Sequence, residues 1–418
     1  MQGVARFAIL VFVFTIPWEN MVVIAGFGTI SRLAGMVAFG LGVIAFLLQP
    51  RFRNLQPFHM LFLGLVMYSA LSYGWTLDQA FSMERIRSNL QLVLFVWLVW
   101  QFVESERQVF QIAQFYVLGA TVAAVGTVAA YVSGVQVVYL RYSAEGFDPN
   151  ELSIILAVAI PLAWYLSLRH SSALLIWGNR LLIPLLLVAI LLTGSRTGLV
   201  VAGVGLLFLL LTLARGSAGA KAALGLLIVL GIAALPHLIP VSTWTRLSTL
   251  EDEIVSGTLN NRTTIWTAGF SVWLDHLAFG VGAGAFPTAV QLVLEARAAP
   301  HNSFLSILVE LGAVGFLLFA AIIFTVWKRT RLLPALERHL YLSILLILAL
   351  GLFTLTWETK KPLWLLCSLM LCHAVARVEG RRDDHHAPSI AETEVRQSTR
   401  LLQTKADNPL LTSPESRR

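Results

Sequence analysis

Long apolar stretches separated by short polar segments run along most of the chain. A bilayer core about 30 Å thick needs roughly 20 apolar residues per spanning helix, so each stretch is predicted as a membrane helix. About twelve stretches can be recognised, near residues 4–18, 33–48, 57–75, 90–103, 109–132, 152–168, 181–193, 199–213, 222–239, 304–327, 340–357 and 363–375. One long interruption, residues 240–301, mixes charges, glycine and tryptophan. The pattern predicts an all-α polytopic membrane protein with one long outer loop that contains short helices.

The composition agrees with lipid as the natural solvent of this chain. Of its 418 residues, 57% are hydrophobic and 13% are charged, and the mean hydropathy is +0.75. A soluble domain carries roughly 25% charged residues, so a soluble fold of this size is excluded. Residues 4–16 lack the cleavage signature of a signal peptide and are predicted as a retained first helix. Cys367 and Cys372 point to different faces of one predicted helix, which indicates neither a disulfide nor a metal site.

Basic residues in the short loops predict the orientation. With the N-terminus inside, the inner loops hold about twice as many Lys and Arg residues as the outer loops. Both termini are therefore predicted in the cytoplasm and residues 240–301 outside. Residues 379–418 are rich in Ser, Thr, Pro and charge and are predicted as a disordered cytoplasmic tail. Residues 1–378 remain as the transmembrane domain.

A polar break at residues 193–198 places an arginine at a predicted helix start. Ser195 occupies the N-cap position, so Arg196 falls in the first turn. A cation there opposes the helix dipole by roughly 0.3–1 kcal/mol. Either Arg196 is a loop residue that snorkels to the membrane interface, or Arg196 and the N–H groups of the helix start hold an anion together.

A second arginine occupies the same kind of position in the long loop. Asn260 and Asn261 precede Arg262, and apolar residues that include Trp266 and Trp273 follow at helical spacing. This spacing predicts an amphipathic helix with an aromatic face, lying at the membrane interface. Two arginines at helix starts on one side of the membrane indicate a shared anionic ligand.

A histidine stands directly before the apolar stretch that begins at Phe304. Asn302 or Ser303 can cap this helix, which leaves His301 at its positive end. The helix dipole disfavours imidazolium there, so a neutral His301 that accepts a proton is predicted. A purely structural histidine is the alternative.

Glu310 lies two turns further along the same stretch, where a carboxylate needs a partner. We expect Arg196 or another outer arginine as that partner; proton handling is the alternative role.

Two weaker motifs lie on the same outer side. Asp148-Pro149-Asn150-Glu151 has the form of a capping box and follows Arg141. Residues 280–284, Gly-Val-Gly-Ala-Gly, have no strand and helix around them that would make a nucleotide loop. They are predicted as a tight turn ahead of His301.

Taken in order, these motifs resemble the bacterial O-antigen ligase and O-antigen polymerase superfamily. The resemblance covers roughly residues 141–327. It rests on an ordered set of motifs: Arg141 with Asp148-Pro149-Asn150, Gly194-Ser195-Arg196-Thr197-Gly198, Arg262 with Trp266, residues 280–286, His301-Asn302-Ser303-Phe304, and Glu310-Leu311-Gly312.

The resemblance implies a multi-pass enzyme of the bacterial inner membrane with a periplasmic active site. Such enzymes move a glycan from an undecaprenyl-diphosphate carrier to an acceptor, which is lipid A-core for ligases and a second lipid-linked repeat unit for polymerases. By similarity Arg196 and Arg262, with Arg141, would bind the diphosphate and His301 would activate the acceptor hydroxyl. Asn302, Ser195 and Glu310 are expected to support them.

The chemistry of the residues agrees with this implication. A sugar diphosphate already has a good leaving group, so transfer needs charge stabilisation and a general base more than a metal. Arginine suits phosphate oxygens, and neutral histidine suits proton abstraction. We therefore expect a metal-independent, inverting ligase without a cofactor, with membrane lipids and no nucleic acid among its partners. A polymerase is the alternative enzyme. A lipid-linked glycan transporter is less well supported, because few charges lie near the bilayer midplane and no internal repeat is evident.

Overall fold

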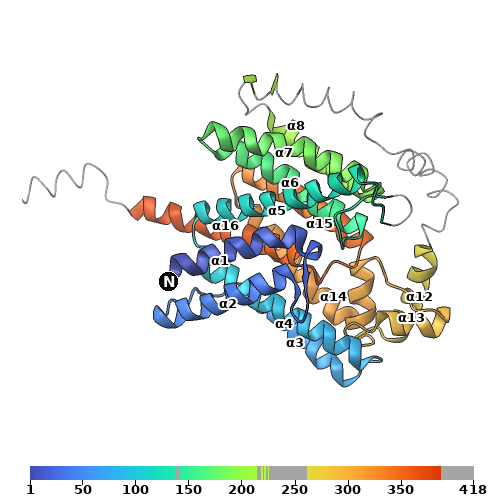
Figure 1. The fold of residues 1–418 in the computed structure, drawn as a ribbon. Coiled ribbons are helices and arrows are strands. Elements are labelled where there is room, and N and C mark those ends of the chain that lie inside the picture. The colour runs from blue at the N-terminus through green and yellow to red at the C-terminus, as the bar shows by residue number, and fades with distance from the viewer. Residues whose placement is uncertain (138–140, 214–217, 220, 223–224, 226–260, 387–418) are drawn as a thin grey trace, which may run out of the picture. The chain divides into compact units, whose positions relative to one another are not determined.

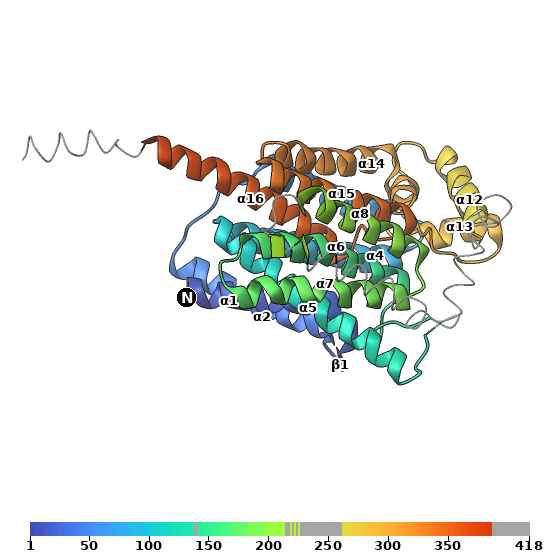
Figure 2. The same ribbon diagram turned by 90° about the horizontal axis from the view of Figure 1, so that it is seen from above.

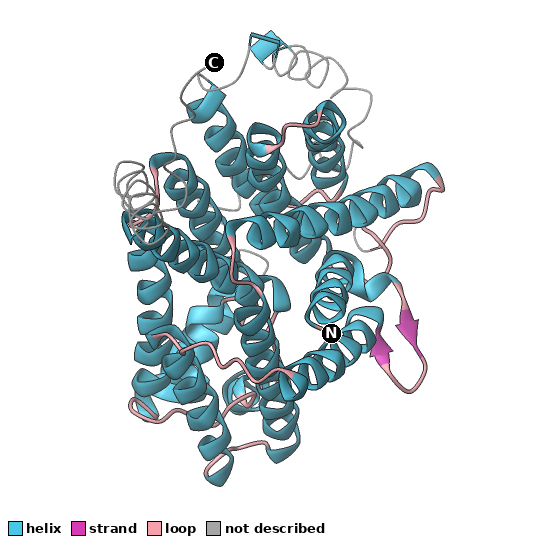
Figure 3. Ribbon diagram, turned by 90° about the vertical axis from the view of Figure 1, so that its left-hand side faces the viewer, coloured by secondary structure: helices cyan, strands magenta, loops and turns pink. Residues whose placement is uncertain are grey.

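The computed structural model describes residues 1–137, 141–213, 218–219, 221–222, 225 and 261–386. Helices dominate this part of the chain, and one short hairpin supplies the only strands in it (Figure 3). Strand β1 (Val23–Ile24) pairs antiparallel with β2 (Gly28–Thr29), with Val23 opposite Thr29. The helices are α1 (Gln2–Thr15), α2 (Ile30–Leu48), α3 (Pro57–Leu71), α4 (Gln79–Phe102), α5 (Glu106–Val132), α6 (Pro149–Arg169), α7 (Ala173–Leu192), α8 (Arg196–Thr212), α12 (Arg262–Asp275), α13 (Phe286–Leu294), α14 (Ser303–Thr330), α15 (Ala335–Thr354) and α16 (Lys361–His386), with 3₁₀ helices η1 (Ile16–Met21) and η2 (Ser72–Gly74).

The apolar stretches that the structure describes are helical over most of their length, and only a few end residues such as 355–357 lie outside the helices. In that part of the chain, eight helices are long and apolar enough to cross a membrane: α1 with η1, α2, α5, α6, α7, α14, α15 and the Lys361–Glu379 part of α16. Helix α8 is apolar but has 17 residues, and α3 has 15. The predicted all-α polytopic membrane architecture is confirmed. The predicted count of about twelve spans stays a prediction, and the stretch at 222–239 falls almost entirely outside the described residues.

Helix α6 lies at the centre of the unit formed by residues 1–374. It packs against α5, α7, α8 and α15 (Figures 1 and 2), and nearly all of its side chains are buried. Asp148 caps its first turn and Pro149 occupies the first helical position, where a missing N–H is harmless. Polar residues at the start of α6 are therefore held in the middle of one end of the bundle.

Helix α14 is interrupted at Gly312, whose φ of 62° and ψ of −167° are not helical. Backbone groups on both sides of the break pair with the segment before α13. Val281 N donates to Val309 O at 3.0 Å, and Ala313 N donates to Leu277 O at 2.8 Å. A buried backbone group needs such a partner, so this segment makes the break in an apolar helix tolerable.

The glycine segment, residues 280–284, fits closely against this break. Gly280, Gly282 and Gly284 all have positive φ, a region that glycine enters at little cost. A Cβ at Gly280 would meet the backbone of Glu310, and a Cβ at Gly312 would meet the backbone of Ala278. The predicted turn is present, and its glycines allow two stretches of backbone to touch.

We expect Gly312→Ala to destabilise the protein. The substitution forces a side chain into a positive φ, at a cost of roughly 1–3 kcal/mol, and against the Ala278 backbone. Gly203→Ala is the matched control, because a Cβ at Gly203 in α8 meets nothing within 4 Å. Thermal unfolding of the purified proteins in detergent should show a clear loss for Gly312→Ala and none for Gly203→Ala. Equal melting temperatures would contradict this account of the break.

The second unit begins at Val375, within α16. Helix α16 continues to His386, so residues 379–386 of the tail predicted to be disordered are helical instead. The polar residues 379–386 continue the helix that begins in the apolar stretch of α16. The rest of the predicted tail lies outside the described residues. Cys367 and Cys372 are both buried and unbonded in α16, as predicted.

Candidate functional site

The start of α6 anchors the candidate site through Asp148. The Asp148 carboxylate accepts the backbone N–H groups of Asn150 at 2.8 Å and Glu151 at 3.1 Å. The predicted N-cap is therefore present. The reciprocal bond of a capping box is not found, because Glu151 forms an ion pair with Lys360 at 2.8 Å instead.

Asn150 connects α6 to the junction between α7 and α8. Its side-chain oxygen accepts hydrogen bonds from Arg141 Nη2 at 2.8 Å and from Ser195 Oγ at 3.0 Å. Ser195 in turn caps α8 by accepting Gly198 N at 3.0 Å. The predicted cap is confirmed, and Arg196 lies in the first turn of α8 beside this network.

Arg141 is a buried member of the same network. Its side chain is 7% exposed, and its Nε donates to Thr193 O at 2.6 Å, at the end of α7. These bonds tie the chain before α6 to the α7–α8 junction. These hydrogen bonds give Arg141 a structural role. Its role as a diphosphate ligand stays a prediction.

Helix α12 brings Arg262 to the His301 loop. The predicted helix is present and begins at Arg262. One turn later, Trp266 donates its indole N–H to Pro300 O at 2.8 Å, which fixes the residue next to His301. Figure 1 shows α12 and α13 at one end of the bundle, near the start of α14.

His301 sits on a strained backbone at the start of α14. Its φ is 44°, and Asn261, before α12, has a φ of 63°. Such values in residues other than glycine cost of order 1–3 kcal/mol and cluster at functional sites. Of the two predicted caps, Asn302 and Ser303, it is Asn302 that caps α14, by accepting Leu305 N at 3.1 Å. The local turn therefore holds His301 outside the helix but next to its positive end.

Burial and the positive charge of Arg262 together favour a neutral His301 ring. His301 is exposed, yet the protein atoms around it remove enough solvent to lower its pKa below the ordinary value, and the positive charge of Arg262 lowers that pKa further. The Asp148 carboxylate opposes the shift. Burial likewise lowers the pKa of Arg262, with Asp148 opposing it. Arg262, His301 and Asp148 are thus electrostatic neighbours, contributed by three different helix starts.

This arrangement, the candidate site, places a cation beside a histidine whose ring is able to accept a proton. Arg262 supplies the positive charge, and the Asp148 carboxylate is a neighbouring negative charge that favours the protonated form of His301. Arg196 lies at the start of α8, which the Asn150 network joins to the start of α6. The residues predicted from three separate motifs therefore meet around the start of α6.

Glu310 belongs to a second, buried ion cluster. Arg85 of α4 contacts Glu310 at 3.4 Å and Glu358 at 2.7 Å. The Ser306 hydroxyl lies 3.1 Å from a Glu358 oxygen and 3.4 Å from a Glu310 oxygen, so it can donate its one proton to either carboxylate. The expectation that Arg196 or another outer arginine pairs with Glu310 is met by Arg85 rather than by Arg196. A proton-handling role for Glu310 stays a prediction.

The sequence analysis does not predict the contacts of three residues in the candidate site and the ion cluster. Asp148 was predicted only to cap a helix, and its charge toward Arg262 depends on how α12 folds back. Trp266 was predicted only as part of an aromatic face. Glu358 gave a usable signal, since it stands beside Lys360 and Lys361 in a charged patch between two apolar stretches.

Metal ligands do not gather in the part of the chain that the structure describes. No group of three or more His, Cys, Asp or Glu side chains within those residues could hold a metal ion. The site geometry therefore gives no metal a defined place among the described side chains.

Comparison with known proteins supports the interpretation of the motifs. The family model described as O-antigen ligase (Wzy_C) matches residues 181–320, a segment that contains Arg196, Arg262, His301 and Glu310. No curated protein matches the chain.

Proposed function

We propose that this chain, whose residues 181–320 match the O-antigen ligase family model, is a membrane glycosyltransferase of the ligase and polymerase type, and specifically an O-antigen ligase. Its donor would be a glycan on undecaprenyl diphosphate and its acceptor lipid A-core. The single observation that carries the proposal is that Trp266 of α12 is hydrogen-bonded to Pro300 O at 2.8 Å, which holds the helix start that bears Arg262 beside the His301 loop at the start of α14. An anion site beside a neutral base is what transfer from a diphosphate requires.

The arginines would bind and neutralise the donor diphosphate. Arg196 and Arg262 both lie in first turns, where helix N–H groups add positive potential. A guanidinium fork holds two phosphate oxygens at once and keeps its charge at every relevant pH. As the bond between the sugar and the diphosphate breaks, the electron pair moves to the phosphate oxygen, and these cations stabilise it.

His301 would activate the acceptor. A neutral imidazole takes the proton of the acceptor hydroxyl while its oxygen attacks the anomeric carbon, a contribution of about 10²–10⁴-fold. Attack from the face opposite the diphosphate inverts that carbon. Asp148 would stabilise the imidazolium formed in this step, which matches its opposition to the lowered pKa of His301.

The proposed location follows from the basic residues of the loops. We place both termini in the cytoplasm, the protein in the bacterial inner membrane and the candidate site on the periplasmic side, because Lys and Arg are more numerous in the loops at the other end. ATP is not expected on that side, which suits a donor that carries its own leaving group.

Transfer should continue in excess EDTA. The proposal gives the charge stabilisation to arginines, and divalent metals need oxygen or nitrogen ligands in a defined geometry. The measurement is product formation by reconstituted protein with and without chelator. A loss of activity that Mg²⁺ or Mn²⁺ restores would show that a metal shares the work of Arg196 and Arg262.

Reconstitution with two acceptors tests the proposed function. Purified protein in vesicles receives one lipid-linked glycan donor together with lipid A-core and a second lipid-linked repeat unit. A ligase joins the glycan to lipid A-core and leaves the chain length of the donor unchanged. Lengthening of the lipid-linked glycan instead would assign the protein to the polymerases, and His301→Ala controls for background transfer.

A further inference from the structure

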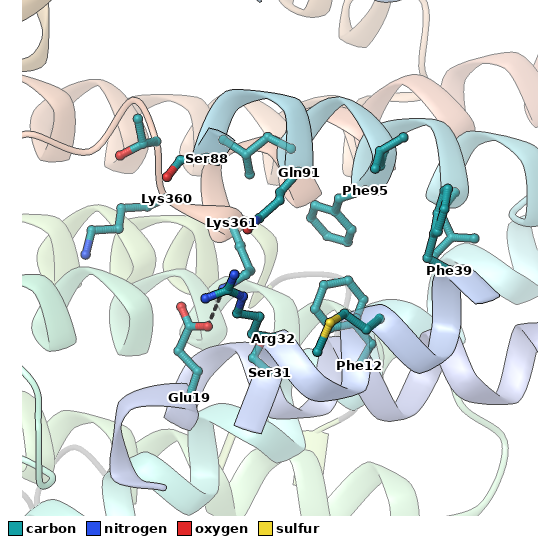
Figure 4. Close-up of a pocket in the computed structure, with 16 residues that line it drawn as sticks. Phe12, Glu19, Ser31, Arg32, Phe39, Ser88, Gln91, Phe95, Lys360 and Lys361 are labelled. Carbon is teal, nitrogen blue, oxygen red and sulfur yellow. Dashed lines mark hydrogen bonds and ion pairs between the residues drawn. The ribbon is translucent and has the colours of Figure 1, made fainter. Parts of the chain in front are cut away.

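A pocket with a charged mouth lies away from the candidate site, between α1, α2, α4 and the start of α16 (Figure 4). Its volume is about 380 Å³, within the range of ligand sites. Arg32, Lys360 and Lys361 line it together with Glu19. Phe12, Phe39 and Phe95 form its apolar part, so the pocket is polar at one end and hydrocarbon-like at the other.

The charges at the mouth leave one cation in excess. Lys361 forms an ion pair with Glu19, and Lys360 pairs with Glu151 at 2.8 Å. Within the described residues the guanidinium of Arg32 forms no salt bridge, and Arg32 is exposed. Arg32, Lys360 and Lys361 thus carry three positive charges against the two carboxylates of Glu19 and Glu151. One singly charged anion would balance the remaining positive charge.

A buried hydroxyl marks the same pocket as a place for a ligand. Ser31 lines the pocket and is 0% exposed, and within the described residues its Oγ has no hydrogen-bond partner. A buried polar group without a partner costs roughly 1–3 kcal/mol. A ligand oxygen next to Arg32 would satisfy this hydroxyl.

The apolar end opens toward lipid. Met36 on α2 and Leu94 on α4 line the pocket and are 47% and 44% exposed. Helix α2 is one of the candidate membrane spans, so exposed apolar side chains on it face hydrocarbon rather than water. A ligand with a hydrocarbon chain can therefore lie partly in the pocket and partly in the bilayer.

We propose that this pocket binds a membrane lipid through its phosphate group. Arg32, with Lys361 beside it, holds the phosphate, Ser31 donates its hydroxyl to a phosphate oxygen, and one chain lies against Phe12, Phe39 and Phe95. The single excess charge suits a phosphodiester. This site is separate from Arg262 and His301, so the proposal does not depend on the enzyme's reaction. The Lys360–Glu151 pair joins the pocket to the start of α6, which carries Asp148.

Native mass spectrometry of the full-length protein in detergent tests the proposal. Phosphatidylglycerol is titrated onto the wild type, Arg32→Gln and Ser31→Ala. The matched controls are Arg87→Gln, an exposed arginine of α4 outside the pocket, and Ser143→Ala, another buried hydroxyl without a hydrogen-bond partner among the described residues. Loss of one charge-assisted bond, about 1.5–3 kcal/mol, should weaken binding by at least about tenfold in Arg32→Gln. Ser31→Ala should weaken it by several-fold, with both controls unchanged.

Two further arms identify the lipid. Inorganic phosphate at millimolar concentration should not displace phosphatidylglycerol, because it lacks the chain. Undecaprenyl diphosphate is titrated in the same way. If it binds more tightly than phosphatidylglycerol and Arg32→Gln weakens its binding equally, the lipid-phosphate site is supported and the carrier lipid is identified as its ligand. Arg262→Ala should leave binding here unchanged, which separates this result from the proposed function. Binding of every lipid to Arg32→Gln and Ser31→Ala at wild-type strength would overturn the proposal.

Discussion

Arg262→Ala and Arg196→Ala should each strongly reduce glycan transfer at limiting donor while the protein stays folded in the membrane. Each arginine lies in the first turn of a helix, where a cation opposes the dipole and gains nothing without an anion. Loss of a charge-assisted contact to diphosphate, about 1.5–3 kcal/mol, should weaken donor binding by roughly 10–100-fold. The measurement is donor affinity of purified protein, with thermal unfolding to confirm the fold.

Lysine variants make this expectation more specific. Arg262→Lys keeps the charge but lacks the planar fork, so most of the donor affinity should be lost as well. Arg87→Lys is the control, since Arg87 is an exposed arginine on α4. Wild-type donor affinity in Arg262→Lys would remove the argument for bidentate binding, although a simpler electrostatic role would stand.

His301→Ala should lower turnover by about 10²-fold or more. The base must be neutral, and burial together with Arg262 lowers the pKa of His301 below its ordinary value of 6.5. The neutral form therefore persists to a lower pH than in a free imidazole. The value of kcat/KM for the wild type should stay level through neutral pH and fall only below pH 6.5, and that acid limb should vanish in His301→Gln.

Neighbouring charges should move the acid limb in opposite directions. Asp148 opposes the lowered pKa of His301, so Asp148→Asn should move the limb to still lower pH. Asparagine caps a helix about as well as aspartate, so α6 should remain intact. Arg262→Gln should move the limb to higher pH in whatever activity remains. Unchanged pH profiles in both variants would show that the acid limb does not arise from the titration of His301.

Local sequence signals were enough to predict the helix starts that build the site. Ser195 was expected as a cap and is one, and of the two candidates Asn302 and Ser303 it is Asn302 that caps α14. A short polar side chain before an apolar stretch acts through neighbours only a few residues away. The position of Arg196 and Arg262 in first turns followed from the same signals. These predictions depend on nothing distant in the chain.

Contacts between distant segments lay beyond such signals. The ion pair between Arg85 and Glu310 joins α4 to α14, and only the packing of those helices selects Arg85 over Arg196. The break at Gly312 depends equally on a distant segment, since backbone groups near Val281 satisfy it. The sequence Glu310-Leu311-Gly312 alone reads as continuous helix. Asp148 likewise gains its second role only when α12 approaches α6.

The central claim is that donor binding and proton abstraction are divided between Arg262 and His301. The most direct test measures donor affinity and the rate at saturating donor separately in His301→Ala. The account predicts donor affinity within about threefold of wild type, together with a rate at saturation that falls by about 10²-fold or more. A His301→Ala protein that binds donor at least about tenfold more weakly but reacts at the wild-type rate at saturation would contradict it, and would make His301 a donor ligand.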